Sequence, residues 1–98
     1  RVDHGWKVRP ECKHLKAPPS SYLRRFSYDT ISHGDAQLQF LASLVGIDRI
    51  MMGSDYCFDM GYEQPVDHVM GQAWMSDADK ALVLGGNARR VLKIAEPA

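Results

Sequence analysis

The most informative stretch of this sequence spans residues 49–59 and reads RIMMGSDYCFD. Residues 49–53 make a short, continuous apolar run, which is the pattern of a parallel strand that is covered on both faces. Asp55 follows this run with only Ser54 between them. The stretch therefore predicts a buried strand with a carboxylate just beyond its carboxyl end.

The segment before this run predicts another strand and then a helix. Residues 26–31 bring aromatic and β-branched side chains together over the length of a strand. Residues 35–45 carry apolar side chains at helical spacing, and Gly46 stands where a helix commonly ends. The predicted helical stripe consists of Leu38, Leu41 and Val45, widened by Phe40 and Leu44.

The start of the chain carries weaker signals. Residues 1–21 mix charges, prolines and histidines without a regular period, which is typical of a loop. The run PPS at residues 18–20 suits the start of a helix, so one or two helical turns are predicted over residues 21–25. Between residue 54 and residue 75 we expect a loop.

Two helices are predicted near the C-terminus. Ser76 is expected to cap a helix over residues 77–84, which ends near residues 85–86. Asn87 is then expected to cap a last helix over residues 88–94. This helix should dock through Val91, Leu92 and Ile94, keep Arg89 and Lys93 in solvent, and be followed by Pro97.

The predicted order of elements is strand, helix, strand, loop, helix, helix. A crossover of this length suits parallel strands, so the chain is α/β with two β/α units. We interpret them as the C-terminal two units of a (β/α)8 TIM barrel plus terminal helices, and such a barrel typically needs about 250 residues. Two units alone leave strand edges open and an apolar face uncovered. Residues 1–98 are therefore expected to be one incomplete barrel domain that needs partners or missing chain.

The composition excludes several classes of protein. The 98 residues include 12 basic and 12 acidic side chains, so nucleic acid is not an expected partner. No apolar run approaches the roughly 20 residues of a membrane span. Cys12 and Cys57 lie outside any CxxC spacing, which indicates free thiols in a cytoplasmic protein. The chain starts at Arg1 without a signal peptide or an initiator methionine, so we expect a shortened polypeptide.

Asp55 is the leading candidate for a residue that carries chemistry. A carboxylate directly after a buried parallel strand points to the end of a barrel where such enzymes place their active sites. Asp55 could ligate a divalent metal there and accept a proton. A cap on the turn after the strand is an alternative of equal weight.

The histidines do not form a metal-binding pattern. His4, His14, His33 and His68 show no HxH or HExxH spacing. His33 follows the first predicted strand and so lies at the same end of the barrel, where packing of the loop is favoured over binding of a substrate. His14 and His68 are expected at the surface.

Polar residues also occur inside the first predicted strand. One of Asp29 and Thr30 must face the interior, because side chains alternate along a strand. A buried polar residue there needs a partner. We favour a satisfied hydrogen bond in the core over a catalytic role.

Four segments together resemble the last third of the amidohydrolase family that contains aminocarboxymuconate-semialdehyde decarboxylase. They occur in the order of the family and at family-like spacing, and they span nearly the whole chain. No one of them is specific by itself. The segments are RVDHGW at 1–6, YDTISH at 28–33, GSDYCFD at 53–59 and GNARR at 86–90.

The resemblance implies a zinc-type site at the mouth of the barrel, with Asp55 as a metal ligand and catalytic residue. The other ligands of the family are histidines that lie upstream of this chain. Arg1 is expected to bind a substrate carboxylate, in some members across a dimer interface, and His33 is a second expected substrate contact. Cys57 stands where the family usually has proline, which restores a backbone N–H and sets a thiol near the metal loop.

The resulting hypothesis is a metal-dependent decarboxylase that releases carbon dioxide from a small carboxylated, muconate-like or aromatic substrate. Related members hydrolyse or hydrate instead. A second hypothesis, preferred for the 98 residues alone, is an inactive fragment without metal that self-associates through open strand edges. A stand-alone metal-binding or interaction module is the least favoured, because its candidate residues are irregularly spaced. These residues are His4, Cys12, His14 and Cys57.

Overall fold

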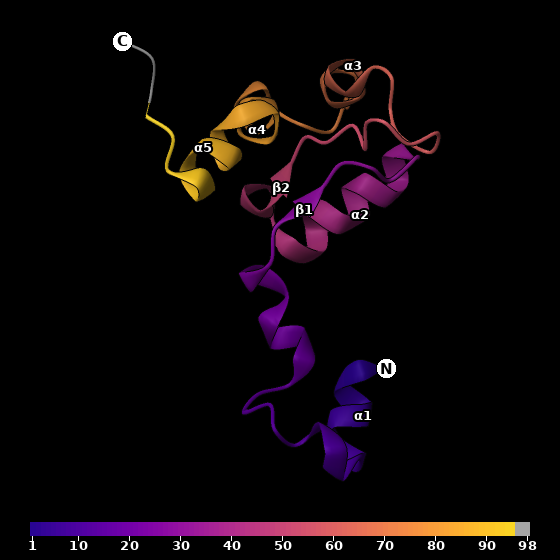
Figure 1. Cartoon of the computed structure of the whole chain (residues 1–98), viewed down its shortest axis with the longest axis vertical. Helices are drawn as coiled ribbons and strands as arrows, with labels where there is room; N and C mark the ends of the chain where they lie inside the picture. The colour runs from indigo at the N-terminus through magenta and orange to yellow at the C-terminus, as the bar shows by residue number, and fades with distance from the viewer. Residues whose placement is uncertain (96–98) are drawn as a thin grey trace.

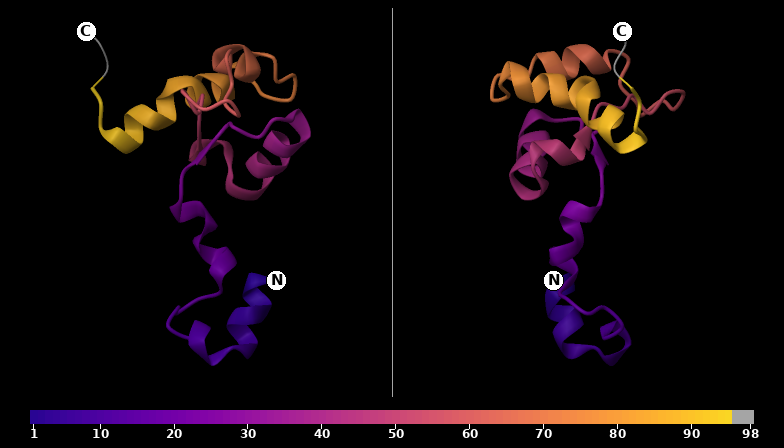
Figure 2. Two further views of the ribbon diagram at one scale, coloured as in Figure 1. Left: turned by 45° about the vertical axis from the view of Figure 1, so that its right-hand side comes forward. Right: turned by 90° about the vertical axis from the view of Figure 1, so that its left-hand side faces the viewer.

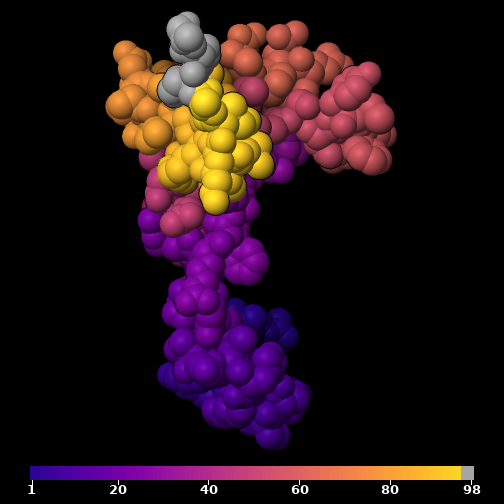
Figure 3. Space-filling model, turned by 60° about the vertical axis from the view of Figure 1, so that its left-hand side comes forward, coloured from indigo at the N-terminus to yellow at the C-terminus, as the bar shows by residue number. Residues whose placement is uncertain are grey.

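The computed structural model describes residues 1–95 and consists of a hooked arm, residues 1–25, and a larger body, residues 26–95 (Figure 1). The radius of gyration is 16.1 Å, whereas a compact chain of this length has about 13 Å. Figure 3 shows the arm standing away from the body on a narrow neck of chain. The hydrophobic core therefore lies in the body alone.

Three short helices form the arm. The sequence predicts a loop over residues 1–21, and this prediction is wrong wherever these three helices lie. The helical turns predicted over residues 21–25 are confirmed. No residue between 1 and 25 is buried, so the arm has no core of its own. The helices are α1 (Val2–Val8) and the 3-10 helices η1 (Pro10–Cys12) and η2 (Pro19–Arg25).

Contacts between distant residues explain why the arm is helical without a periodic apolar pattern. Trp6 Nε1 donates a hydrogen bond to Leu15 O at 3.0 Å, and Ser20 N donates to Asp3 Oδ1 at 2.8 Å. Lys13 Nζ lies 4.8 Å from the centroid of the Trp6 ring, which is the geometry of a cation–π contact. Such contacts leave no period in the sequence.

The centre of the body is a parallel sheet of two strands, β1 (Tyr28–Asp29) and β2 (Ile50–Met51). Helix α2 (Asp35–Val45) crosses from one strand to the other and lies beside them (Figure 1). Gly46 ends α2 with a φ of 91°, a conformation that glycine adopts without strain. The 3-10 helix η3 (Ile47–Arg49) then leads into β2.

The prediction is confirmed for both ends of α2 and for the existence of both strands. Each strand is shorter than predicted, and each has one hydrogen-bonded strand partner within residues 1–95. The pairing is parallel, as the predicted β/α units require. The chain is thus a mixture of helices and a parallel strand pair.

The C-terminal part of the body is helical, including one helix in the region expected to be a loop. The predicted cap at Ser76 is confirmed, since Asp79 N donates to Ser76 Oγ at 3.1 Å. The elements are α3 (Pro65–Met70), α4 (Asp77–Ala81), η4 (Leu82–Gly86) and α5 (Asn87–Leu92). After α3, three helical elements, α4, η4 and α5, follow one another along one continuous rod (Figure 2). No helix within residues 1–95 is long and apolar enough to cross a membrane.

The rod formed by α4, η4 and α5 continues through residues 85–86, where the sequence predicts an end. Element η4 is a turn of π-helix, in which Asn87 N donates to Leu82 O, five residues earlier. Asn87 has helical φ and ψ of −66° and −43°, so the prediction that it caps a separate helix is wrong. The rod ends at Lys93, whose φ is 56°. Pro97 lies outside the described residues.

The core lies between α2, β2 and the C-terminal helices. Leu38 and Val45 are buried, as the predicted stripe requires, and Leu41 is half-buried. The predicted widening of the stripe is wrong, because Phe40 and Leu44 are 68% and 51% exposed. The buried apolar side chains are Leu38, Val45, Ile50, Val69, Met75 and Val83.

The apolar residues of the last helical turns are uncovered. The docking predicted for Val91, Leu92 and Ile94 does not occur within residues 1–95, since all three side chains are exposed. Lys93 is exposed, as predicted, but Arg89 is half-buried. Burial of each apolar side chain would contribute roughly 1.5–3 kcal/mol, which this chain by itself does not gain.

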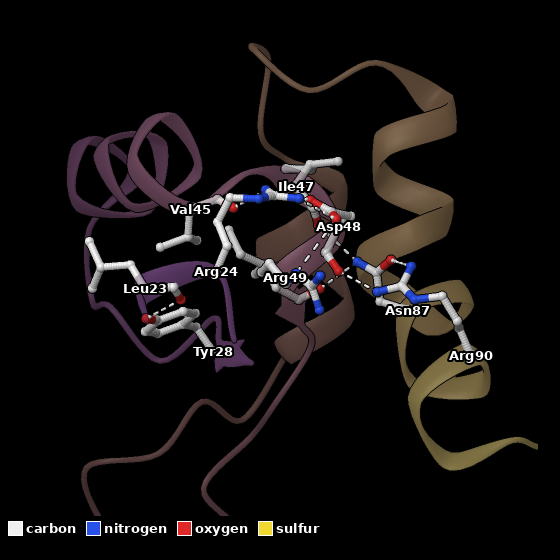
Figure 4. Close-up of polar contacts among 10 residues, drawn as sticks. Leu23, Arg24, Tyr28, Val45, Ile47, Asp48, Arg49, Asn87 and Arg90 are labelled. Carbon is white, nitrogen blue, oxygen red and sulfur yellow. Dashed lines mark hydrogen bonds and ion pairs between the residues drawn. The ribbon is translucent and has the colours of Figure 1, made fainter. Parts of the chain in front are cut away.

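The buried side chain of Asn87 joins the rod to the strand pair (Figure 4). Its Nδ2 donates to Ile47 O and to Ile50 O, both at 2.8 Å. Its Oδ1 accepts a hydrogen bond from Arg90 at 3.0 Å, and Arg90 also donates to Asp48 O. Both ends of the amide are therefore satisfied, as burial of a polar group requires.

Arg24 joins the arm to the body (Figure 4). Its guanidinium donates two hydrogen bonds to the Asp48 carboxylate, at 2.9 and 3.1 Å, and a third to Val45 O. The hydrogen bonds from Arg24 lower the pKa of Asp48 below its ordinary value of 3.8, and they raise the pKa of Arg24. Because both side chains are partly exposed, water screens the pair.

We predict that Asn87→Ala lowers the free energy of unfolding by about 1–3 kcal/mol, because the buried carbonyl of Ile50 loses this donor, whereas Ile47 O keeps the amide of Ile50. Asn87→Asp tests the same contacts at equal volume, since an ionised carboxylate cannot donate. Urea denaturation followed by circular dichroism measures both variants. An Asn87→Asp chain as stable as the wild type would show that the amide does not hold the rod.

From the Arg24–Asp48 pair we predict that the folding stability of the chain falls in acid as Asp48 becomes protonated. A carboxyl with a lowered pKa in the folded state contributes stability above its unfolded pKa and loses it as pH falls through the folded pKa. The stability advantage of the wild type over Asp48→Asn is therefore expected to be full near neutral pH and to shrink below about pH 4. Thermal denaturation across this range measures it, with Glu63→Gln as the control. A difference that does not vary with pH would contradict the linkage.

Candidate functional site

The carboxyl ends of β1 and β2 lie against each other. Thr30, directly after β1, is 0% exposed, and its Oγ1 accepts a hydrogen bond from Gly53 N at 3.2 Å. Thr30 is therefore the predicted polar residue with a satisfied hydrogen bond in the core, whereas Asp29 is exposed. A Cβ at position 53 would lie 3.2 Å from Asp29 Cβ, so the two strand ends approach closely. Asp55 lies two residues beyond this contact.

Residues 54–62 form a closed loop, here termed the Asp55 loop. Its base is closed by Tyr62 N, which donates to Ser54 O at 2.8 Å. Inside the loop, Phe58 N donates to Asp55 O at 2.9 Å. These hydrogen bonds hold the backbone on both sides of Asp55.

Asp55 presents its side chain to solvent. Its φ of 58° lies in the left-handed region, which aspartate tolerates better than most residues do. Within residues 1–95 its carboxylate takes part in no hydrogen bond or ion pair, so the alternative of a turn cap gains no support. The carboxylate is open to a ligand.

His33, in the loop after β1, reaches the Asp55 loop. Its Nε2 is hydrogen-bonded to Met60 O, and because a carbonyl only accepts, this nitrogen carries the proton. The ring stacks on Tyr62, with 4.6 Å between ring centroids. His33 therefore packs against the loop, and its contact with a substrate stays a prediction.

Sequence reasoning missed Tyr62 and gave His68 no role in this region. The Tyr62 ring lies between the two imidazoles, 4.3 Å from the centroid of His68. His68 is half-buried and not at the surface as predicted, and its Nε2 is buried without a hydrogen-bond partner in the described structure. The signal that could have found it is Pro65, a preferred first residue of a helix, which predicts α3.

The Asp55 loop also lines an open cavity of about 690 Å³. Binding sites for small molecules have volumes of about 300–1,000 Å³. The lining comes from residues between 54 and 65 and includes Phe58 and Cys57. Cys57 is an exposed free thiol, and Cys12 is also free, as predicted.

Arg1 lies apart from these residues. It is exposed and precedes the first turn of α1 on the arm, away from the body (Figure 1). A single chain therefore does not bring Arg1 together with Asp55 and His33. Its contribution across a dimer interface stays a prediction.

Asp55 offers a single carboxylate to a metal ion. No group of three or more His, Cys, Asp or Glu side chains within residues 1–95 could hold one. Zinc sites in proteins take three or four protein ligands. The donor set of this chain therefore fits one ligand of a shared site, and a stand-alone metal-binding module gains no support.

Comparison with known proteins identifies the family of the chain. Residues 2–94 match the family model described as Amidohydrolase. The chain belongs to the amidohydrolase family. The resemblance drawn from the four sequence segments is thereby confirmed.

Two relatives of this amidohydrolase chain bear the name 2-amino-3-carboxymuconate-6-semialdehyde decarboxylase. The one from Dictyostelium discoideum is 32% identical over 94% of this chain and 26% of its own length. The one from Caenorhabditis elegans is 33% identical over 98% of this chain and 24% of its own length. The chain thus spans about a quarter of the curated relatives that it matches.

Gly61 provides a test of the closed loop. A Cβ at this position would lie 2.3 Å from Ser54 O and 3.0 Å from Asp55 O, which are backbone atoms. Gly61→Ala must therefore open the loop, and we expect the amide of Tyr62 to exchange with solvent at least about tenfold faster, equal to about 1.4 kcal/mol. Hydrogen exchange followed by nuclear magnetic resonance measures this rate.

Gly85→Ala is the matched control. Nothing lies within 4 Å of a Cβ at Gly85, which is inside the rod. Alanine there should stabilise the chain by about 0.5–1 kcal/mol and leave the Tyr62 amide unchanged. Equal exchange in Gly61→Ala and Gly85→Ala would mean that the loop is not closed at Ser54.

Proposed function

We propose that this chain forms the Asp55-bearing part of a metal-dependent amidohydrolase that decarboxylates a small carboxylated, muconate-like or aromatic substrate. The observation that carries the proposal is the open Asp55 carboxylate just beyond the carboxyl ends of a parallel strand pair. The names of both relatives support the reaction class.

In the proposed whole protein, β1 and β2 are the last two strands of a (β/α)8 barrel. The parallel pairing and the crossover through α2 support this arrangement. The exposed Val91, Leu92 and Ile94 support it as well, because the rest of the barrel domain would cover them. Active sites of such barrels lie at the carboxyl ends of the strands, where His33 and the Asp55 loop lie.

Asp55 would hold a divalent metal, zinc in this proposal, through one carboxylate oxygen, with histidine ligands from preceding chain. When bound, the metal supplies Lewis acidity, which polarises a substrate oxygen or activates water. The other oxygen of Asp55 can accept a proton at this site. Arg1 of a second subunit would hold the substrate carboxylate through a bidentate pair, so the proposed enzyme is a dimer.

The test compares variants of the full-length protein loaded with zinc. Asp55→Asn and Asp55→Ala are expected to lose bound metal and to slow release of carbon dioxide more than about 100-fold, since loss of an outer-shell partner alone costs about 10–100-fold. Asp59→Asn, at an exposed carboxyl of the same loop, is the matched control. Metal and turnover that survive at Asp55→Ala would exclude the ligand role. Hydrolysis or hydration without carbon dioxide would assign another reaction of the family.

A second candidate applies to the 98 residues alone, which we propose to be inactive and self-associating. The observation that favours it is a sheet of two strands with open edges, next to exposed apolar residues of α5. Light scattering with metal analysis of the isolated chain distinguishes a metal-free assembly from a monomer.

A further inference from the structure

We propose that Tyr62 is a positioning residue for Asp55. Its ring is clamped between His33 and His68, and the clamp fixes the Asp55 loop. This inference rests on the proposed function, in which the Asp55 carboxylate binds a metal.

Three rings form the clamp. His33 and Tyr62 stack with 4.6 Å between centroids and 17° between planes, and Tyr62 and His68 stack with 4.3 Å and 16°. Each ring comes from a different segment, namely the loop after β1, the end of the Asp55 loop and α3. The stack therefore joins the loop after β1 to the Asp55 loop and α3, which follow each other closely later in the sequence.

The backbone segments that carry the two outer rings are tied to each other outside the Asp55 loop. Gln72 is 2% exposed, and its Nε2 donates to Asp35 Oδ1 and to His68 O, both at 2.9 Å. Asp35 begins α2 two residues after His33. Trp74 Nε1 donates to Gln72 Oε1 at 2.7 Å and so fixes the direction of the amide. This bridge sets the separation of the outer rings, and the Asp55 loop meets the stack through the Tyr62 ring and through Met60 O, to which His33 is hydrogen-bonded.

The residue that carries the middle ring is hydrogen-bonded to the carbonyl just before Asp55. Tyr62 N donates to the carbonyl of Ser54, the residue before Asp55, at 2.8 Å. A Cβ at Gly61 would lie 2.3 Å from the same carbonyl, so the absence of a side chain there allows the close approach of the two backbone segments. A displaced Tyr62 ring would pull this N–H away and free the φ of Asp55, which sets the direction of its carboxylate.

His68 supplies the second flat face of the clamp. Its Nε2 is buried without a hydrogen-bond partner in the described structure. A leucine would occupy the volume without the cost of burying an unsatisfied polar atom. What the imidazole adds is a flat face against Tyr62, which restricts the orientation of that ring.

The experiment compares Tyr62→Leu with Tyr62→Phe in the full-length, zinc-loaded protein. Tyr62→Leu is expected to weaken zinc affinity about 10–100-fold, as loss of an outer-shell partner does, and to lower kcat with KM nearly unchanged. Tyr62→Phe keeps the stacked ring, so its zinc affinity and its kcat should both be close to those of the wild type. Tyr22→Leu, on the arm, is the matched control. Wild-type zinc affinity in Tyr62→Leu, or a phenylalanine variant as weak as the leucine variant, would overturn the inference.

Amide hydrogen exchange separates this inference from the proposed function. Protection of the Tyr62 amide should fall in Tyr62→Leu whether or not zinc is bound. If the wild type neither binds zinc nor releases carbon dioxide but this protection depends on the ring, the function fails and the clamp is supported. If protection is unchanged, the clamp fails whatever the reaction. His68→Leu, which removes one outer ring, gives the same readout should Tyr62→Leu not fold.

Discussion

The buried amide of Asn87 is the contact on which the body depends. It binds one carbonyl in η3 and one in β2, and so it fixes the rod against the strand pair at two points. A third point lies close by, where Met52 N donates to Val83 O at 2.9 Å. Together these contacts set the position and the rotation of the rod. The Asp55 loop starts two residues beyond Met52, so its origin is fixed by the same contacts.

The arm and the body are stabilised by different means. The body buries apolar side chains, whereas the arm relies on hydrogen bonds, a cation–π contact and the partly exposed pair of Arg24 and Asp48. Segments with few buried contacts open at a lower free energy than the core does. Salt screens exposed ion pairs further. Arg1 therefore lies on the part of the chain that opens most easily, while Asp55 lies on the part held by the core.

Features that follow from a local period could be predicted from the sequence, and features made by distant contacts could not. The stripe at Leu38 and Val45 and the glycine after it define α2, and the apolar run before Asp55 places that carboxylate at a strand end. At Asn87 the local preference for a helix cap is overridden by carbonyls 37 and 40 residues away. His33, one partner of Tyr62, likewise lies on another segment, so no local spacing reveals this contact.

The π-helical turn η4 has a consequence for the length of the rod. Such a turn holds one residue more than an α-helical turn, so it rotates every later side chain by about 100° relative to an uninterrupted α-helix. This rotation is part of what brings Asn87 against β2. Loss of one residue from η4 would turn the amide away from its carbonyls even if every remaining residue were kept. During divergence of the sequence, the rod can therefore accept exchanges of residues more readily than a deletion.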